Sequence, residues 1–148
     1  MEDDLLFLAV TETWLHPGIL DAEVSISGYQ LVRQDRVGRI HGGVAFWIKE
    51  GFMVKDIWKT SNGFVESLLI EISELKIVLS LLYRPPGCPE NLFNNIIDMT
   101  SETFNIYENG RKGHNLLTLG DLNFPFVERS IIYNFSIARN MIIKYYSR

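Results

Sequence analysis

The sequence predicts an α/β fold, and three observations support that prediction. Several short apolar runs are bounded by turn residues, a pattern typical of strands that are covered on both faces in α/β sheets. A strand, a helix and a second strand then follow one another, which predicts a crossover connection between parallel strands. The length of 148 residues, with 47% hydrophobic and 22% charged residues, is that of one globular domain rather than a disordered chain.

Five strands are predicted in the first half of the chain, each from an apolar or alternating run. These runs are residues 5–10, 28–33, 44–48, 52–58 and 64–72. Lys49-Glu50-Gly51 is a short glycine-containing connection, which predicts a hairpin between residues 44–48 and 52–58. Residues 34–40 hold two arginines around a glycine and are predicted to form an exposed basic loop.

A second hairpin is predicted at the middle of the chain. Residues 64–72 and 76–83 are both strand-like and are separated by Ser73-Glu74-Leu75, a connection short enough for antiparallel neighbours. Pro85-Pro86 ends the second strand, because proline cannot donate a hydrogen bond to a sheet ladder.

A helix and a further strand follow. Pro89 suits the first helical turn, apolar residues recur at helical spacing up to Tyr107, and Asn109-Gly110 ends the helix. Residues 116–119 are the next predicted strand. The crossover should place them parallel to residues 76–83, with the carboxyl ends of both strands at the same rim of the sheet.

Asp121 and Asn123 come directly after the strand at residues 116–119, where open α/β sheets gather ligands. Their spacing of two predicts that both side chains point to one side of the strand end. A carboxylate that accepts and an amide that donates could hold a water and an anionic oxygen together. The alternative is an ordinary turn, because Asp and Asn are common turn residues.

Glu12 and Tyr83 occupy corresponding places on two other strands. Glu12 follows the first predicted strand, and Tyr83 ends the strand before the two prolines. Each also has a simpler interpretation, Glu12 as a solvated or helix-capping acid and Tyr83 as a half-buried strand aromatic. His41 and His114 stand in predicted loops, so both are expected to be exposed loop residues.

The bulk composition narrows the classes of function. The net charge of −4 gives no global basic field for nucleic acid, although a nuclease that uses a divalent cation does not need one. No apolar run approaches the ~20 residues of a membrane helix, and the acidic start of the chain argues against a signal peptide. The single cysteine, Cys88, allows no internal disulfide. An intracellular protein, nuclear or cytoplasmic and without a membrane, is expected.

Six short blocks together resemble one known pattern. They are Thr11-Glu12-Thr13-Trp14-Leu15, residues 33–36, Gly42-Gly43-Val44-Ala45, Glu66-Ser67-Leu68, Tyr83-Arg84-Pro85-Pro86 and Gly120-Asp121-Leu122-Asn123. In order and spacing the chain resembles the endonuclease domain of non-long-terminal-repeat (long-interspersed-element type) retrotransposons, a branch of the endonuclease/exonuclease/phosphatase superfamily. The resemblance covers about residues 5–125. It implies a partial domain at residues 1–125 and a divergent segment at residues 126–148, which is predicted to be helical.

The resemblance implies a deoxyribonuclease-I-like sandwich of two mixed sheets with flanking helices, here incomplete, that cuts a phosphodiester bond with Mg²⁺ or Mn²⁺. Glu12 resembles the metal-ligating glutamate, and Tyr83 the tyrosine near the scissile phosphate. Asp121 resembles the aspartate that orients or activates the attacking water, and Asn123 the asparagine that steadies the phosphate. Carboxylate oxygens do suit a hard divalent cation, and amide or phenol donors suit the charge on phosphoryl oxygens.

The DNA backbone is the partner that this resemblance implies. Arg33, Arg36 and Arg84 could contact its phosphates, although a solvated loop is an equally good interpretation of the first two and a surface charge of the third. The sequence alone gives no oligomeric state.

Two features of the family have no counterpart in the chain. The family's first strand carries an asparagine near the metal, and its last part carries a Ser-Asp-His block with a catalytic histidine, whereas no His or Asp follows Asn123 here. The sequence therefore leaves three functions open: a DNA endonuclease of weak activity, an inactive retrotransposon-derived remnant that binds metal or nucleic acid weakly at most, and a phosphatase for a small phosphomonoester or lipid headgroup.

Overall fold

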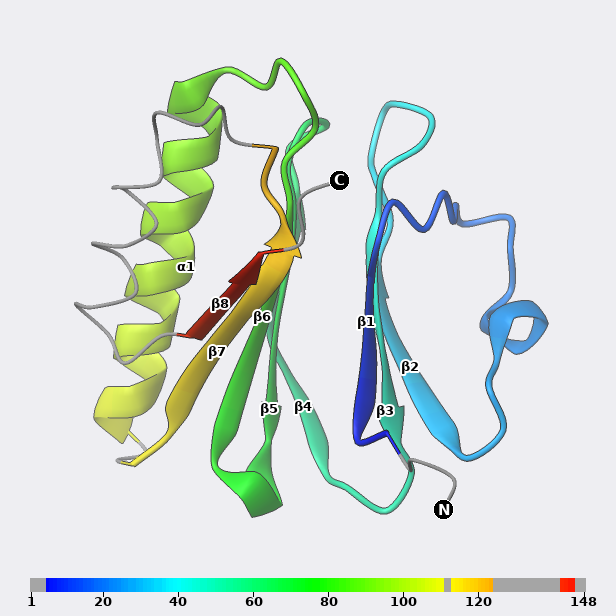
Figure 1. Cartoon of the computed structure of the whole chain (residues 1–148), viewed down its shortest axis with the longest axis vertical. Helices are drawn as coiled ribbons and strands as arrows, with labels where there is room; N and C mark the ends of the chain where they lie inside the picture. Colours follow the sequence, from blue (N-terminus) through cyan, green and yellow to red (C-terminus); the bar gives the residue numbers. More distant parts are fainter. Residues whose placement is uncertain (1–4, 111–112, 124–141, 146–148) are drawn as a thin grey trace.

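The computed structural model of the chain describes residues 5–110, 113–123 and 142–145, which form two β-sheets and one α-helix (Figure 1). The strands are β1 (Phe7–Thr11), β2 (Tyr29–Gln34), β3 (Val44–Lys49), β4 (Val54–Ser61), β5 (Glu66–Ile72), β6 (Ile77–Tyr83), β7 (Asn115–Asp121) and β8 (Ile142–Tyr145). Helix α1 is Glu90–Gly110, and two short 3₁₀ helices are η1 (Asp21–Val24) and η2 (Ser73–Leu75). The predicted α/β class is confirmed.

The smaller sheet has three antiparallel strands in the order β1-β3-β2. Strand β3 therefore has a neighbour on each side and has no free edge for a further strand. The predicted hairpin between residues 44–48 and 52–58 is wrong for this reason. After Gly51 the chain leaves this sheet, and β4 pairs with β5 in the other one.

The larger sheet has five strands in the order β4-β5-β6-β7-β8. Strands β4, β5 and β6 are antiparallel neighbours, and β7 and β8 continue the sheet parallel to β6. The predicted hairpin β5–β6 and the predicted crossover through α1 to a parallel strand are both confirmed. The larger sheet is thus mixed, as expected, whereas the smaller sheet is purely antiparallel, because its strands are joined without a crossover helix.

Strand β8 corrects the prediction for the end of the chain. Residues 126–148 were expected to be helical, but Ile142–Tyr145 is a strand that pairs in parallel with β7, with Ile142 beside Leu117 and Tyr145 beside Gly120. Isoleucine and tyrosine favour strands, and pairing with β7 outweighs the weak helical spacing. The rest of that predicted helix lies outside the described residues.

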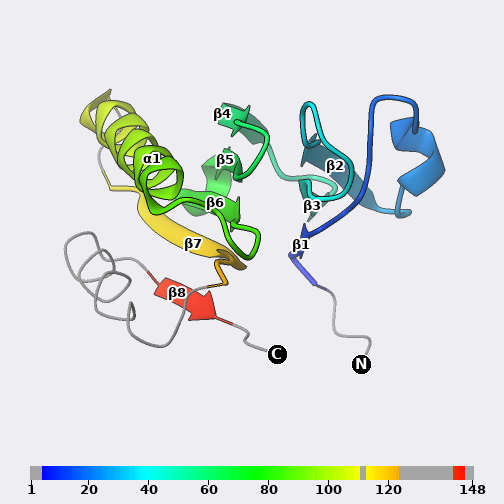
Figure 2. The same cartoon turned by 90° about the horizontal axis from the view of Figure 1, so that it is seen from above.

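The two sheets pack face to face and enclose the main core (Figure 2). Alternate residues of β3 point toward alternate residues of β5 and β6, as expected for strands with one face in a sandwich. The buried members of this core are Val44, Phe46, Ile48, Leu68, Ile70, Ile72, Leu79, Leu81 and Tyr83. Full burial of one such apolar side chain contributes about 1.5–3 kcal/mol, so this interface holds the two sheets together.

Helix α1 covers the outer face of the larger sheet (Figure 1). Phe93, Ile96 and Phe104 of the helix are buried against the reverse sides of the same central strands, where Leu69 and Leu82 lie. Strand β5 is therefore buried along its whole length, including its two acids, Glu66 and Glu71. The architecture is a two-sheet sandwich with a helix on one outer face.

The outer face of the smaller sheet is partly covered by η1, where the indole Nε1 of Trp47 donates to the carbonyl of Val24 at 3.0 Å. Within the described ranges, no helix has both the length and the apolar composition needed to cross a membrane.

Candidate functional site

Three of the four predicted site residues meet at one rim, formed by the carboxyl ends of β1, β6 and β7 at the top of Figure 1. Tyr83 and Asp121 are the last residues of two adjacent parallel strands and are paired in register. Glu12 directly follows β1 of the other sheet, and the Tyr83 hydroxyl donates a hydrogen bond to its carboxylate. The sandwich thus brings together groups that are 71 residues apart in sequence.

Tyr83 is almost fully buried, with 2% of its surface exposed. Burial raises the pKa of its phenol, and the hydrogen bond to the Glu12 carboxylate raises that pKa further. Both effects favour the neutral phenol, since a phenolate would be desolvated and would face an anion. Tyr83 therefore keeps its proton and acts as a hydrogen-bond donor at this rim over the ordinary pH range.

The fourth residue, Asn123, lies past the strand end and does not continue the predicted alternation. Its φ of 44° is left-handed, so its side chain does not follow the direction of Asp121. Instead the Asn123 backbone N–H donates to Asp121 Oδ1 at 3.3 Å, and its Nδ2 donates to the Arg84 carbonyl at 2.8 Å. The two side chains lock the turn after β7 rather than pointing out together.

Arg84, which directly follows β6, adds further hydrogen bonds to this turn. The side chain is 7% exposed, and its Nη1 donates to the carbonyls of Leu122 at 3.3 Å and Asn123 at 3.1 Å, while its Nη2 donates to the carbonyl of Cys88 at 3.1 Å. Its backbone N–H continues the ladder to the Asp121 carbonyl at 2.9 Å. The interpretation of Arg84 as a surface charge is wrong, because its guanidinium is buried and donates to three backbone carbonyls after β6 and β7.

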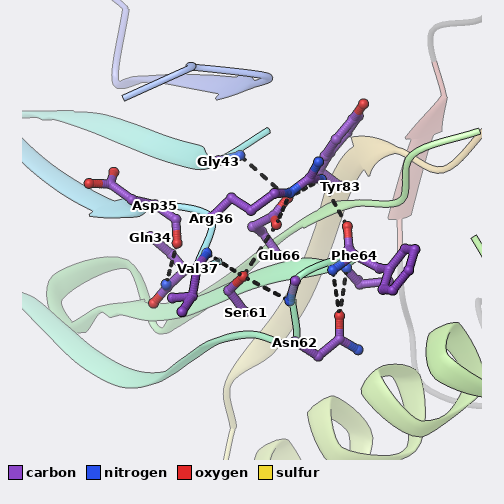
Figure 3. A network of polar contacts seen from close by, with 12 residues as sticks. Gln34, Asp35, Arg36, Val37, Gly43, Ser61, Asn62, Phe64, Glu66 and Tyr83 are labelled. Atoms are coloured by element: carbon purple, nitrogen blue, oxygen red, sulfur yellow. Dashed lines mark hydrogen bonds and ion pairs between the residues drawn. The ribbon is translucent and has the colours of Figure 1, made fainter. Parts of the chain in front are cut away.

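A buried ion pair lies beside Tyr83, and Figure 3 shows its contacts. The Arg36 guanidinium binds the Glu66 carboxylate through two hydrogen bonds of 2.7 and 2.9 Å, and its Nη2 also donates to the Phe64 carbonyl at 2.8 Å. Glu66 further accepts from the Gly43 N–H and the Ser61 hydroxyl, both at 3.3 Å. The pair joins the loop after β2 to the start of β5.

The ion pair also borders Tyr83. The Arg36 guanidinium carbon lies 5.5 Å from the centre of the Tyr83 ring, within cation–π range. The hydrogen bonds to Glu66 raise the pKa of Arg36. Because Glu66 is fully buried, neither charge can be removed alone without leaving its partner unpaired in the interior.

Sequence reasoning assigned no role to Glu66. The signal that could have found it is an acid at the start of an apolar run that is covered on both faces, because a buried carboxylate requires a cationic partner. Arg36 was proposed as a contact for DNA, and Arg33 likewise. Arg33 lies 3.2 Å from Asp21 and 3.5 Å from Asp35, so both arginines have partners within the chain.

Strained backbone is concentrated at the same rim. Four of the five non-glycine residues with positive φ in the described ranges lie there, namely Glu12 (54°), Trp14 (57°), His41 (67°) and Asn123 (44°). Such conformations cost about 1–3 kcal/mol each and persist only where surrounding contacts enforce them. Their clustering marks this rim as a place where side chains are held in particular positions.

His114, expected to be exposed, is instead packed on the opposite part of the fold. Its side chain is 8% exposed, its Nε2 lies 3.0 Å from Glu71 Oε1, and its ring meets Tyr107 edge to face at 5.8 Å. The Tyr107 hydroxyl also donates to Glu71. The burial of His114 follows from the buried Glu71 carboxylate on β5, which requires polar partners. Tyr107 of α1 and His114, just before β7, supply them. His41 does lie in an exposed loop, as predicted.

The residues at the rim fit a divalent cation in kind but form no complete set. Glu12 is exposed and Asp121 is half-buried, and carboxylates of this type hold Mg²⁺ together with water and substrate phosphate. Among the described residues, however, no cluster of three or more His, Cys, Asp or Glu side chains could hold a metal ion by itself.

Comparison with known proteins adds no family assignment. No family model matches the chain, and no curated protein matches it.

Proposed function

We propose that this chain carries part of a metal-dependent phosphodiesterase site that nicks DNA, on a deoxyribonuclease-I-like sandwich of the retrotransposon endonuclease type. The observation that supports it best is the meeting of Glu12, Tyr83 and Asp121 at one rim. Two carboxylates and a neutral phenol are the groups needed beside a phosphodiester: ligands for a hard cation, an acceptor for a water proton and a hydrogen-bond donor.

Glu12 would hold Mg²⁺ or Mn²⁺, because its carboxylate is the exposed one. A bound divalent cation would stabilise the negative charge that builds on the phosphoryl oxygens. Asp121, at the end of β7, would orient the attacking water and accept its proton. Tyr83 would donate to a phosphoryl oxygen after exchanging its hydrogen bond to Glu12.

Asn123 would act mainly through the turn that it locks. One of its Nδ2 hydrogens is directed at the Arg84 carbonyl, and an amide nitrogen carries a second that could reach a phosphate oxygen. Loss of the side chain would move the strand end that carries Asp121. A site of this kind implies DNA as the partner and action in the nucleus or cytoplasm.

The test is nicking of supercoiled plasmid with and without Mg²⁺ or Mn²⁺, with binding of Mn²⁺ followed separately by electron paramagnetic resonance. We expect slow nicking, because no histidine follows His114 and a catalytic set that lacks one member loses most of its rate. Glu12→Gln and Asp121→Asn should each lower the metal-dependent rate by at least about 10- to 100-fold. Glu12→Gln should also weaken Mn²⁺ binding.

Asp98→Asn is the matched control, since Asp98 is an exposed acid on α1 and should change neither rate nor Mn²⁺ binding. Nicking that survives both site variants would contradict the proposal. A hydrolysis of small phosphomonoesters that is lost in the same variants would indicate a phosphatase instead.

The second candidate is an inactive relative that retains weak metal or nucleic-acid binding. It is favoured by the hydrogen bonds that Tyr83 and Asn123 already make within the chain. Mn²⁺ binding that depends on Glu12, with no nicking above the metal-free rate, would identify this case.

A further inference from the structure

An exposed aromatic pair stands beside the candidate phosphate site. The indole of Trp14 is 57% exposed, and its ring centre lies 4.3 Å from that of the His41 imidazole, with the planes tilted by 54°. Of the other two tryptophans, Trp47 is buried and Trp58 is half-buried. Trp14 is only two residues from Glu12, so this pair belongs to the segment that carries the candidate metal ligand.

The two aromatic residues stand on backbone segments that are hydrogen-bonded to one another. Trp14 and His41 have positive φ values of 57° and 67°, which are uncommon for non-glycine residues and especially for a residue as bulky as tryptophan. The Trp14 N–H donates to the Gly42 carbonyl at 2.8 Å, and the Thr13 N–H donates to the Gly43 carbonyl at 3.3 Å. The segment after β1 is thereby tied to the end of the loop before β3.

Glycine suits both positions where these segments touch, because Gly42 and Gly43 have positive φ values of 72° and 87°. A Cβ atom on Gly43 would lie 2.5 Å from the Thr13 hydroxyl, and one on Gly42 would lie 2.4 Å from the Arg36 guanidinium. Either added Cβ would therefore have to displace a neighbouring side chain, and the buried Arg36–Glu66 pair anchors the start of the same loop. The exposed aromatic pair thus stands on segments that are joined by backbone hydrogen bonds.

The surroundings of the pair suit a nucleic acid. Arg39 is exposed in the same loop, and its guanidinium lies 4.3 Å from the centre of the Phe64 ring. Aromatic faces bind unpaired bases by stacking, with nearby cations that attract the backbone. Stacking on a fixed, exposed indole needs no ordering of the protein when the strand binds.

We propose that Trp14 and His41 form a stacking surface for an unpaired nucleobase of the DNA strand whose phosphate lies at the rim. This inference rests on the proposed function and extends it, since it assigns base contacts to residues with no part in the chemistry. The surface would favour a frayed or single-stranded target over a fully paired one.

The test measures binding rather than cleavage, so its failure is distinct from failure of the nuclease proposal. Fluorescence anisotropy of a labelled short oligothymidylate is followed with the whole chain in EDTA, together with the tryptophan emission. We expect quenching of the emission on binding. Trp14→Asn should weaken binding by about 5- to 150-fold, the range for loss of one base–aromatic stack, and Trp14→Phe should restore most of it.

Asparagine is chosen because it tolerates left-handed φ better than other non-glycine residues, and melting curves by circular dichroism check that the variant is folded. His41→Asn should weaken binding in the same direction. Ile106→Ala on α1 is the control, since Ile106 is 69% exposed and lies on the helix away from the rim. The same oligonucleotide with abasic sites should bind the wild type as weakly as the normal one binds Trp14→Asn.

Three outcomes would overturn the inference. They are unchanged affinity in Trp14→Asn, equal binding of the abasic strand, and no binding of the oligonucleotide by the wild type. The last outcome, with Trp14 instead responding to an apolar peptide, would indicate a protein partner.

Discussion

Glu66 shows how much of the rim depends on one side chain. Four donors point at its two oxygens: two from Arg36, one from Gly43 and one from Ser61. A fully buried carboxylate is unfavourable unless it is paired and hydrogen-bonded. Its partners come from β2, β3 and β4 or the loops beside them, so this carboxylate fixes both the loop that carries His41 and the cation beside Tyr83.

Breaking that ion pair should be costly. Glu66→Leu or Arg36→Met alone should lower the free energy of unfolding by about 3–5 kcal/mol, because each leaves an unpaired buried charge. The double variant should cost clearly less than the sum of the two. Urea unfolding followed by circular dichroism gives the coupling energy of this cycle.

The exposed pair Asp56–Lys59, with N···O at 3.1 Å and about half of each side chain exposed, is the control cycle and should give about 0–1 kcal/mol. A cost below about 1 kcal/mol for Glu66→Leu would show that the pair does not hold the rim.

Tyr83 should make stability depend on pH in the alkaline range. Its pKa is raised in the folded state, so above about pH 10 the folded chain keeps a proton that the unfolded chain releases. The stabilisation is therefore complete below the unfolded pKa and is lost as pH rises toward the folded one. At about pH 11 the loss should be about 1.4 kcal/mol.

Tyr83→Phe removes the pH-dependent stabilisation by the Tyr83 phenol, while the other tyrosines remain. Urea unfolding of both proteins at about pH 8 and about pH 11 should show a larger loss for the wild type than for the variant. Parallel losses in the two proteins would mean that the phenol titrates normally.

At the scale of elements, the strand end at β7 depends on one glycine. A Cβ on Gly120 would lie 1.9 Å from the Leu82 carbonyl oxygen of the neighbouring strand, and the φ of Gly120 is 151°. The obstruction is backbone, so no side-chain rotation relieves it. Gly120 brings the ends of β6 and β7 together and thereby sets Tyr83 beside Asp121.

Gly120→Ala should destabilise the fold by about 3 kcal/mol or more, the upper range for overpacking, measured as a shift in the urea midpoint. Gly87→Ala is the control, because Gly87 also has positive φ, 73°, but has no atom within 4 Å of the added Cβ. It should cost only about 1–2 kcal/mol, the price of the left-handed conformation. Equal losses of unfolding free energy in Gly120→Ala and Gly87→Ala would show that the contact between Gly120 and Leu82 does not limit stability.

Local pattern was sufficient to predict most elements, and it failed where pairing decided the outcome. Proline and glycine signals bounded α1 well, and the β5–β6 hairpin followed from a three-residue connection. The connection after β3 looked equally like a hairpin, but β3 already had two neighbours. Strand β8 was missed because four residues carry little periodic signal and their partner lies far away in sequence.

On the scale of the whole molecule, the candidate site could be predicted only in part. Glu12, Tyr83 and Asp121 stood at strand ends in the sequence, so their meeting at a rim followed from the rule for carboxyl ends of strands. The packing of two sheets, which puts Glu12 against Tyr83, is a long-range outcome. The roles of Glu66 and Arg84 depended on burial, which single residues in a sequence do not reveal.

The contact between Glu12 and Tyr83 has a consequence for folding. It spans 71 residues and joins strands of two different sheets, so it can form only after both sheets are built and packed. Contacts so distant in sequence close late and slowly, because the loop entropy is lost before the contact is gained. A partly folded chain whose two sheets have not yet packed therefore lacks the contact between Glu12 and Tyr83.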